Sequence, residues 1–347
     1  MDEEIFEESD DTRLIEASET PEEAVFDVTL RPQTLIEFIG QDQIKEPLSI
    51  SMEAAKGREE ALEHILLYGN PGLGKTTLAS IIAREMNANI KVTAGPALER
   101  VGDLAAILSN LGAGDVLFID EIHRMNHTIE EVLYTAMEDF AIDIIIGKGP
   151  GARTLRMPLE KFTLIGATTK MNLLSSPFRD RFGHMYHLSF YEHEDIEKIL
   201  KRSAEVLNAK MEGDAAKLIA TRARRTPRVA NRLLKRLRDY AQIRNSGIIS
   251  LASANEALSM LRVDHEGLDE VDHKILRALV EKFSGGPVGL ATLAAAIAEE
   301  MDTVESIYEP YLLQIGMLER TPRGRKATNA AYQHLGITPP LTQDILV

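Results

Sequence analysis

The sequence has no cysteine among its 347 residues. Disulfides and cysteine-based zinc sites are therefore excluded. The chain also lacks a signal-peptide pattern at its start, and no apolar run approaches the roughly 20 residues that a membrane span needs. We therefore expect a cytoplasmic protein. A hydrophobic content of 44% over this length predicts two or three globular domains.

Basic residues are scarce: 39 Lys and Arg stand against 54 Asp and Glu, for a net charge of −15. This balance disfavours a nucleic-acid partner, because phosphate binding depends on Lys and Arg. Residues 1–25, however, hold eleven acids and one base, so the remaining 322 residues carry a net charge of only −5. We expect residues 1–25 to form a disordered, acidic tail, with docking on a partner as the alternative.

Short apolar runs at Ile65–Tyr68, Val116–Ile119 and Phe162–Ala167 alternate with segments of helical spacing. Such runs are typical of strands buried on both faces, and their alternation with helices predicts a parallel α/β sheet. We expect this α/β domain over residues 26–190 and a small, all-helical domain over 191–262. Residues 263–347 show one helix, two short helices and a hairpin, which is the order of a winged helix.

A phosphate-binding loop follows the first apolar run. The segment Gly69–Thr77 reads GNPGLGKTT and precedes a stretch able to form a helix. Glycines let the backbone N–H groups turn toward a β-phosphate, Lys75 reaches the β- and γ-phosphates, and Thr76 ligates Mg²⁺. The sequence therefore predicts an ATP site rather than a Gly-rich turn, with these nucleotide-binding residues: Gly72, Leu73, Gly74, Lys75, Thr76 and Thr77.

Two acids end the second apolar run, at Asp120 and Glu121. Because ligands gather at the carboxyl ends of parallel strands, we expect Asp120 beside the phosphate-binding loop, with a polar strand end as the alternative. Asp120 would hold the Mg²⁺ water shell together with Thr76, and Glu121 would orient the attacking water.

Four further residues could sense or stabilise the γ-phosphate. The third apolar run ends in Thr168 and Thr169, whose hydroxyls could contact it, although threonine is also common at strand ends. An arginine from a neighbouring subunit can stabilise charge on a transferred phosphoryl group. We assign this role to Arg181, and an interface role to Arg179.

Pro227 opens a helix and places Arg228 in its first turn, within reach of phosphates. The other bases of this helix are expected to form a solvated face: Arg232, Lys235, Arg236 and Arg238.

His184, His187 and His193 lie close together in the sequence. On a strand, positions 184 and 187 point to opposite faces, and His193 lies beyond its end. No familiar ligand spacing is met, so we expect no metal site there.

The terminal hairpin is basic, with a turn at Pro322–Gly324 and the bases Arg320, Arg323, Arg325 and Lys326. Such a cluster suits phosphate contacts on DNA of any sequence, and an ordinary solvated turn is the alternative. The preceding helix carries Glu305 and Glu309, which disfavours a sequence-specific regulator.

Another hairpin is predicted between Phe140 and Leu159. Apolar residues alternate from Ile142 to Ile146, a glycine-rich turn covers residues 147–151, and alternation resumes at Leu155 and Met157. Spacing alone leaves burial in the core and exposure toward a partner equally open.

Taken together, five motifs resemble those of AAA+ ATPases: GNPGLGKTT (69–77), DEIHR (120–124), GATT (166–169), SPFRDRFG (176–183) and TPRVANRLLKRLRD (226–239). A narrower set resembles the RuvB family of bacterial Holliday junction branch-migration motors, over about residues 26–339: Arg31-Pro32, Phe38–Gln41, Ala136–Asp139, Gly285–Leu290 and Thr321–Arg325. Asn70 departs from this pattern, since the family often has proline there.

The resemblance implies a large ATPase domain, a lid domain and a DNA-binding winged helix. It implies nucleotide contacts as follows: Leu30 and Arg31 at the adenine, Tyr191 beside the nucleotide, Thr169 as first sensor, Arg228 as second sensor, Arg181 as finger, and Glu138, Asp139 and Phe140. It also implies a ring of six subunits on duplex DNA, a RuvA-type junction-binding partner docked on Leu155 and Met157, and a RuvC-type resolvase in the same complex.

The sequence thus predicts an ATP hydrolase with Mg²⁺ that pulls duplex DNA to migrate Holliday junctions in recombination and repair. One rival is a clamp-loader-like or protein-remodelling AAA+ ATPase, whose last domain would grip protein. Another is an ATP-switched winged-helix regulator that reads one operator. Stimulation of ATP hydrolysis by naked duplex DNA excludes the first, and equal affinity for unrelated duplexes excludes the second.

Overall fold

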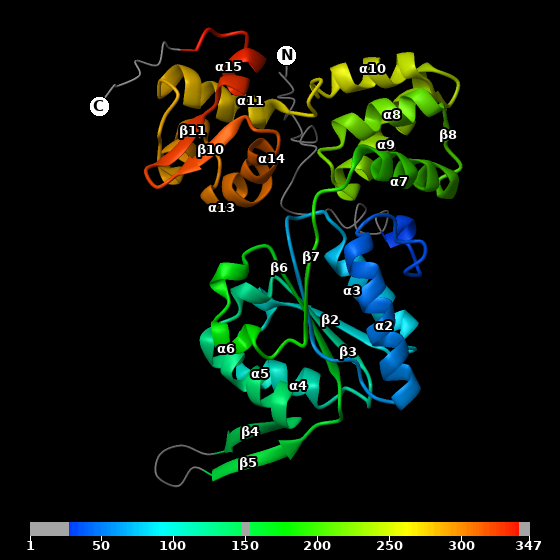
Figure 1. Ribbon diagram of the computed structural model, residues 1–347, viewed down its shortest axis with the longest axis vertical. Helices are drawn as coiled ribbons and strands as arrows, with labels where there is room; N and C mark the ends of the chain where they lie inside the picture. Colours follow the sequence, from blue (N-terminus) through cyan, green and yellow to red (C-terminus); the bar gives the residue numbers. More distant parts are fainter. Residues whose placement is uncertain (1–27, 147–152, 340–347) are drawn as a thin grey trace, which may run out of the picture. The chain divides into compact units, whose positions relative to one another are not determined.

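The computed structural model describes residues 28–146 and 153–339 (Figure 1). The predicted acidic tail, 1–25, and the predicted hairpin turn, 147–151, lie outside the described residues. The described chain forms two compact units, residues 31–191 and residues 192–339 with 28–30. None of the described helices combines the length and apolarity that crossing a bilayer requires.

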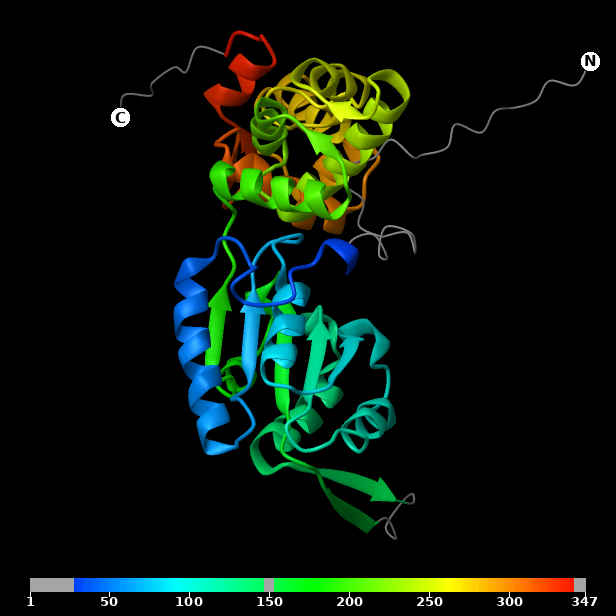
Figure 2. The same cartoon turned by 90° about the vertical axis from the view of Figure 1, so that its right-hand side faces the viewer.

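The first unit is a parallel sheet covered by helices on both faces. Its five strands run in the order β2-β3-β6-β1-β7, and every neighbouring pair is parallel. Figure 2 shows the strands pointing to one common edge. The elements are α2 (Asp42–Arg58), β1 (Ile65–Tyr68), α3 (Lys75–Glu85), β2 (Ile90–Ala94), η1 (Gly95–Ala97), α4 (Val101–Leu108), β3 (Val116–Asp120), η2 (Ile122–Arg124), α5 (His127–Asp139), β6 (Thr163–Thr168), η4 (Met171–Leu173), α6 (Ser176–Arg179) and β7 (His184–His187).

The three strands predicted from continuous apolar runs are β1, β3 and β6, and they are adjacent in the sheet. Every residue of β6 is buried, as a strand covered on both faces requires. On one face the core is closed by α4 and α5, with Leu104, Ile129 and Leu133 fully buried. The predicted parallel α/β fold is therefore confirmed.

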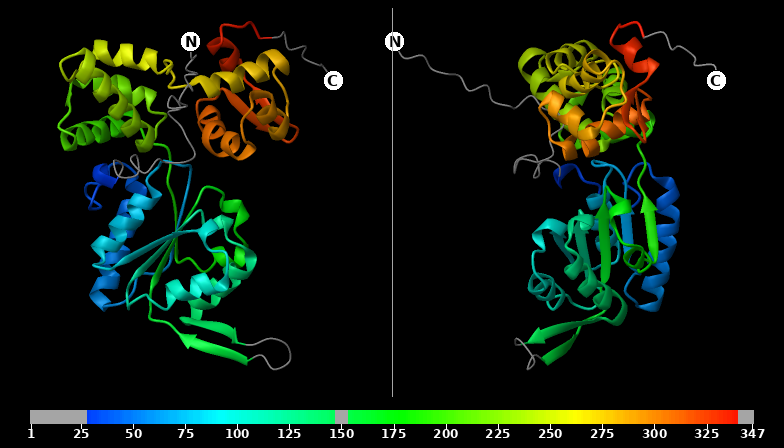
Figure 3. Two further views of the ribbon diagram at one scale, coloured as in Figure 1. Left: turned by 180° about the vertical axis from the view of Figure 1, so that it is seen from behind. Right: turned by 90° about the vertical axis from the view of Figure 1, so that its left-hand side faces the viewer.

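An antiparallel hairpin leaves this unit between α5 and β6. It consists of β4 (Ala141–Ile146) and β5 (Arg153–Pro158), and it pairs Ile142 with Met157 and Ile144 with Leu155. Figures 1 and 3 show the hairpin projecting away from the sheet. The predicted hairpin is confirmed in its two strands.

The second unit begins with four helices that the sequence predicted as an all-helical domain. They are joined by a two-residue parallel strand pair: α7 (His193–Val206), β8 (Lys210–Met211), α8 (Gly213–Arg222), α9 (Pro227–Arg244), β9 (Ile248–Ile249) and α10 (Leu251–Met260). The prediction of a solvated basic face on α9 was wrong for Arg232, which is buried. Its long aliphatic stem permits such burial.

The remaining residues form the predicted winged helix. Its elements are α11 (Glu270–Arg277), η5 (Ala278–Lys282), α12 (Leu290–Ile297), α13 (Met301–Thr303), η6 (Val304–Tyr308), α14 (Glu309–Gln314), β10 (Leu318–Thr321), β11 (Gly324–Ala327) and α15 (Asn329–His334). Strands β10 and β11 are antiparallel, and Val288 adds a bridge to Arg325. Gly324 has φ of 133°, and a Cβ there would lie 2.2 Å from the Val288 carbonyl oxygen, so only glycine fits.

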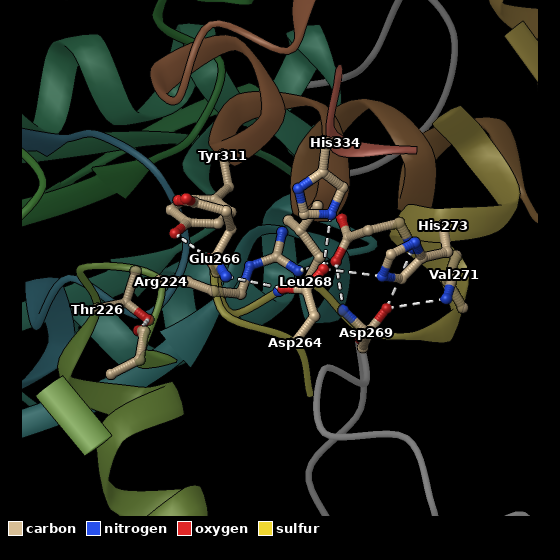
Figure 4. Close-up of polar contacts among 12 residues, drawn as sticks. Arg224, Thr226, Asp264, Glu266, Leu268, Asp269, Val271, His273, Tyr311 and His334 are labelled. Carbon is tan, nitrogen blue, oxygen red and sulfur yellow. Dashed lines mark hydrogen bonds and ion pairs between the residues drawn. The ribbon is translucent and has the colours of Figure 1, made fainter. Parts of the chain in front are cut away.

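A buried ion pair links the helical domain to the winged helix. Arg224, between α8 and α9, donates from Nη1 to Oδ2 of Asp272 in α11 at 2.6 Å, and both side chains are buried. The guanidinium lies 4.7 Å above the ring of Tyr311 (Figure 4). Burial raises the pKa of Asp272, and the charge of Arg224 opposes that shift. Within this unit, the pair fixes the loop after α8 against α11.

Arg224→Met is expected to lower the free energy of unfolding of this unit by about 3 kcal/mol, because Asp272 would remain as an unpaired buried carboxylate. Adding Asp272→Leu should recover much of that loss. Urea unfolding measures both effects. The matched control is Arg262→Met, which removes an exposed pair with Glu270 and should cost less than about 1 kcal/mol. Equal losses for the two single variants would contradict a special role for the buried pair.

Candidate nucleotide site, wing and hairpin

The phosphate-binding loop connects β1 to α3 with three left-handed glycines. Gly69, Gly72 and Gly74 have φ of 143°, 77° and 97°. A Cβ on Gly69 would lie 2.4 Å from the backbone oxygen of Leu188, so the loop cannot pass there with a side chain. Helix α3 starts at Lys75 directly after Gly74, which leaves its N-terminal N–H groups at the loop. This is the geometry that receives a phosphate.

Lys75 is held inside the loop that it serves. Its side chain is buried, and Nζ donates to the backbone oxygens of Gly69 and Asn70 at 2.8 Å each. The two carbonyls hold the ammonium over the loop, where a phosphate would replace them as its partner. Asn70 takes part through its backbone, so a residue other than proline is compatible with this arrangement.

Tyr191 closes the loop from the other side. Its hydroxyl donates to the backbone oxygen of Leu73 at 3.1 Å, and its side chain is buried. The ring of Phe38 also contacts the position of Gly74, where a Cβ would approach it at 3.2 Å. The family resemblance predicts Tyr191 beside the nucleotide, and the structure places its side chain against the loop. Phe38 entered only as part of a family motif, and its contact with the loop was missed.

The end of β3 brings Asp120 to the same loop. The hydroxyl of Thr76 donates to Oδ2 of Asp120 at 3.3 Å, while the backbone N–H of Glu121 donates to Oδ1 at 2.8 Å. A hydroxyl and a carboxylate at this separation are the oxygen ligands that Mg²⁺ prefers, directly or through its water shell. The residues predicted to hold the metal are therefore side by side.

Glu121 has left-handed backbone, with φ of 45°. A non-glycine residue in this conformation is strained, and such strain is concentrated at functional sites. Its carboxylate accepts from Nη1 of Arg124 at 2.8 Å, which orients it. The pairing with Arg124 was not predicted, although both residues stand in the DEIHR motif.

Strand β6 ends between β3 and β1, and its two threonines have different environments. Thr168 is buried, its hydroxyl lies 2.9 Å from Nδ1 of His123, and it accepts from the backbone N–H of Lys170. Thr169 lies one residue beyond the strand and is only partly buried. Thr168 is thus engaged within the protein, and Thr169 is the threonine at the open edge. His123 is a further site residue to which the sequence analysis gave no role.

Arg181 lies at the opposite edge of the sheet. It precedes β7, whose first residue, His184, pairs with Ile65 at the start of β1, whereas the phosphate-binding loop follows the end of β1. Its Nη2 contacts Glu138 at 2.9 Å, and its guanidinium lies 4.9 Å above the ring of Tyr134. Burial, reinforced by a hydrogen bond to the Glu130 carboxylate, raises the pKa of Tyr134, so this phenol stays protonated.

Glu138, Asp139 and Phe140 share that edge. Phe140 packs against Phe162, next to the start of β6, and Asp139 pairs with Arg156 at 2.6 Å. The structure therefore does not bring these three residues to the phosphate-binding loop of their own chain. Together with Arg181 they form one surface, at the amino ends of the strands.

Three predicted nucleotide contacts come from the remaining segments: Leu30, Arg31 and Arg228. Arg228 stands in the first turn of α9, after Pro227, as predicted. Leu30 is buried, and its backbone oxygen accepts from Nη1 of Arg202 at 2.8 Å. Arg31 is half-buried, with its backbone oxygen bound by the Gln33 amide. The adenine and sensor roles of these residues remain predictions.

On the wing, Arg320 and Arg325 are a cross-strand pair, and both bind Glu309. Their Nε atoms each donate to Oε1 of Glu309 at 3.0 Å, and their Nη2 atoms lie 2.9 and 3.1 Å from Oε2. The Glu309 side chain is 1% exposed, that of Arg325 14% and that of Arg320 51%. The sequence predicts phosphate contacts for both arginines, with an ordinary solvated turn as the alternative, and does not reveal their pairing with Glu309. Arg325 is held by a buried carboxylate, while Arg323 at the turn and Lys326 are exposed. The DNA contacts of Arg320, Arg323 and Arg325 remain predictions.

The apolar side chains of the β4–β5 hairpin differ in burial. Ile142 is fully buried in the core, and Ile144 and Met157 pack partly against it. Leu155 is 52% exposed. The base of the hairpin is therefore core, and Leu155 is an exposed apolar side chain among the residues of the hairpin whose burial the structure describes.

Comparison with known proteins gives one consistent family. Residues 30–188 match the Holliday junction DNA helicase RuvB P-loop domain, residues 191–264 the RuvB AAA lid domain, and residues 265–336 the RuvB C-terminal winged helix domain. The chain is 58% identical, over 94% of its length and 93% of the relative's, to the Holliday junction branch migration complex subunit RuvB of Dehalococcoides mccartyi. It is 56% identical to the protein of the same name from Chloroflexus aurantiacus, over 94% of each chain.

Solved structures agree with this family. The Thermotoga maritima RuvB Holliday junction branch migration motor has a TM-score of 0.83 and 50% identity, covering 90% of this chain and all of that one. A point mutant of the Thermotoga maritima protein has a TM-score of 0.84 and 51% identity, covering 90% and 99% of the two chains. With all three domain models matched in order, the chain belongs to the RuvB family of Holliday junction DNA helicases.

Proposed function

We propose that this chain is the ATP-driven motor subunit of a Holliday junction branch migration complex, acting in the cytoplasm in recombination and repair. The observation that supports the proposal is that one chain combines a phosphate-binding loop with Thr76 beside Asp120, an arginine on the opposite edge of the same sheet, and a winged helix. We also propose domain bounds at 26–190, 191–262 and 263–347.

Within the site, Lys75 and the backbone N–H groups of the loop hold the phosphates of ATP. Thr76 and Asp120 would hold Mg²⁺, which would supply positive charge to the β- and γ-phosphates. Glu121, oriented by Arg124, positions the attacking water and accepts its proton, and Thr169 contacts the γ-phosphate. We also propose nucleotide contacts for Tyr191, for Arg228 as second sensor, and for Leu30 and Arg31 at the adenine.

Arg181 completes the site of a neighbouring subunit. Because it lies at the amino ends of the strands and its own loop lies at the carboxyl ends, a ring of subunits is the simplest arrangement that uses it. Glu138, Asp139 and Phe140 would accompany it across the interface. We propose a ring of six around duplex DNA.

A RuvA-type protein is the partner that we propose for the β4–β5 hairpin, through Leu155 and the half-buried Met157. We also propose that a RuvC-type resolvase acts in the same complex.

The alternative function is that of a clamp-loader-like or protein-remodelling AAA+ ATPase. The test is the steady-state ATPase rate with unrelated, naked duplexes. The proposal predicts stimulation by all of them equally. A rate indifferent to duplex DNA would favour the alternative.

Arg181→Ala is expected to bind ATP but hydrolyse it poorly, and Lys75→Ala to fail in binding ATP. Mixed together, they should regain part of the wild-type ATPase rate, because some interfaces then combine an intact loop with an intact arginine. The ATPase rate across mixing ratios is the measurement. A flat line at the level of the separate variants would count against action between subunits.

Leu155→Ser should leave the basal ATPase rate and unfolding temperature unchanged and abolish branch migration that depends on the RuvA-type partner. The reason is that the variant removes an exposed apolar contact and nothing from the core. The matched control is Ile50→Ser on α2, also an exposed apolar residue, which should migrate junctions normally. If Leu155→Ser binds the partner as tightly as wild type, the docking role is wrong.

Arg323→Ala should weaken duplex binding about equally on every sequence and lower the slope of log K against log salt by roughly 0.9, the effect of one lost phosphate contact. Titrations at several salt concentrations measure the slope. The control Arg277→Ala removes the same charge from α11, where Arg277 is exposed, and should leave the slope unchanged.

Arg325→Ala is a different kind of variant. It strips a partner from the buried Glu309, and the winged helix should lose about 3 kcal/mol of stability. A loss of affinity in Arg325→Ala without loss of stability would return this residue to the DNA surface.

A further inference from the structure

Three histidines surround one carboxylate beside the winged helix. Asp264 lies between α10 and α11, and its Oδ1 accepts the backbone N–H groups of Glu266 and Leu268 at 2.9 Å each. Its Oδ2 lies 2.8 Å from Nε2 of His273 and 2.7 Å from Nε2 of His334. Figure 4 shows both imidazoles directed at this carboxylate from different helices. The backbone contacts fix the carboxylate, so its second oxygen faces two nitrogens.

His265 adds a third imidazole. Its ring stacks on that of His334, with centroids 4.9 Å apart and planes 28° apart. One ligand atom from each of Asp264, His265 and His334 lies within 4.8 Å of the others. The His265 side chain is 66% exposed, and its Nε2 has only a distant contact of 3.9 Å with Glu266. His273 and His334 hydrogen-bond to Asp264, whereas the position of His265 beside them is not explained by such a bond.

We propose that Asp264, His265 and His334 form a binding site for a divalent transition-metal cation, with Zn²⁺ as the best chemical match. Two imidazoles and a carboxylate are a ligand set that Zn²⁺ takes, with metal–ligand distances of about 2.0–2.2 Å. Ligand atoms around a tetrahedral ion at those distances stand about 3.4 Å apart. The present separations, from 2.7 Å to no more than 4.8 Å, bracket that value. Small side-chain rotations therefore close the site.

The exposed side of His265 gives a cation access from solvent and leaves a fourth position for water. His273 then serves as the outer partner of Asp264, hydrogen-bonded to the ligating carboxylate as metal ligands commonly require. Mg²⁺ is a poor match, because it prefers six oxygen ligands. The site is thus distinct in chemistry from the Thr76–Asp120 pair. A bound ion would join the segment after α10 to α15, which lie 70 residues apart in the sequence.

The test is a titration of the full chain with Co²⁺, in excess Mg²⁺ and without nucleotide, followed by its visible absorption and then by displacement with Zn²⁺. Wild type should bind one Co²⁺ per chain with the intense bands of a tetrahedral site, and Zn²⁺ should abolish them. His265→Ala should weaken binding by at least about 10-fold, since even outer partners of a metal contribute that much.

The matched control is His127→Ala, another exposed histidine, on α5, which should bind Co²⁺ as wild type does. Because His265 is exposed, His265→Ala is expected to fold and to keep the basal ATPase rate, which verifies the sample. The absence of tetrahedral bands in wild type would overturn the proposal. So would equal Co²⁺ affinity in wild type and His265→Ala.

Discussion

Parallel pairing of β1, β3 and β6 is the constraint on which the site depends. Parallel strands end at one edge, so the loop after β1, the acids at the end of β3 and the threonine after β6 converge although they are far apart in the sequence. The same constraint puts Arg181 and Glu138 at the other edge, where they cannot reach their own phosphates. In the function that we propose, one catalytic site is therefore divided between two copies of the chain.

In the second unit, buried carboxylates hold loops and strands against helices. Asp272 binds Arg224, and Glu309 binds Arg320 and Arg325. Such pairs contribute little net stability when intact, but the loss of one partner leaves a buried charge. Their effect is geometric, since each fixes a loop or a hairpin against a helix. Glu309 binds Arg320 and Arg325 of the wing, whereas Arg323 is exposed at the turn between β10 and β11.

Local sequence patterns predicted the helices and strands, whereas the contacts of individual side chains depend on residues far apart in the sequence. Apolar runs and the glycine loop are contiguous signals, so β1, β3, β6 and Lys75 were placed correctly from sequence alone. The partnership of Glu309 with two wing arginines joins residues 11 and 16 positions apart and follows no periodicity. Asp264 and His334 are 70 positions apart, and no spacing motif connects them. The burial of Arg232 depends on packing that its position in α9 does not reveal.

The most direct measurement of the central claim is the conversion of a synthetic four-way junction to duplex products, followed over time with the full chain and a RuvA-type protein. We predict conversion with ATP and Mg²⁺, and no conversion with a non-hydrolysable ATP analogue or when Glu121 is replaced by Gln. Conversion at the same rate without ATP hydrolysis would contradict a motor. So would no conversion by a chain that hydrolyses ATP and binds duplex DNA normally.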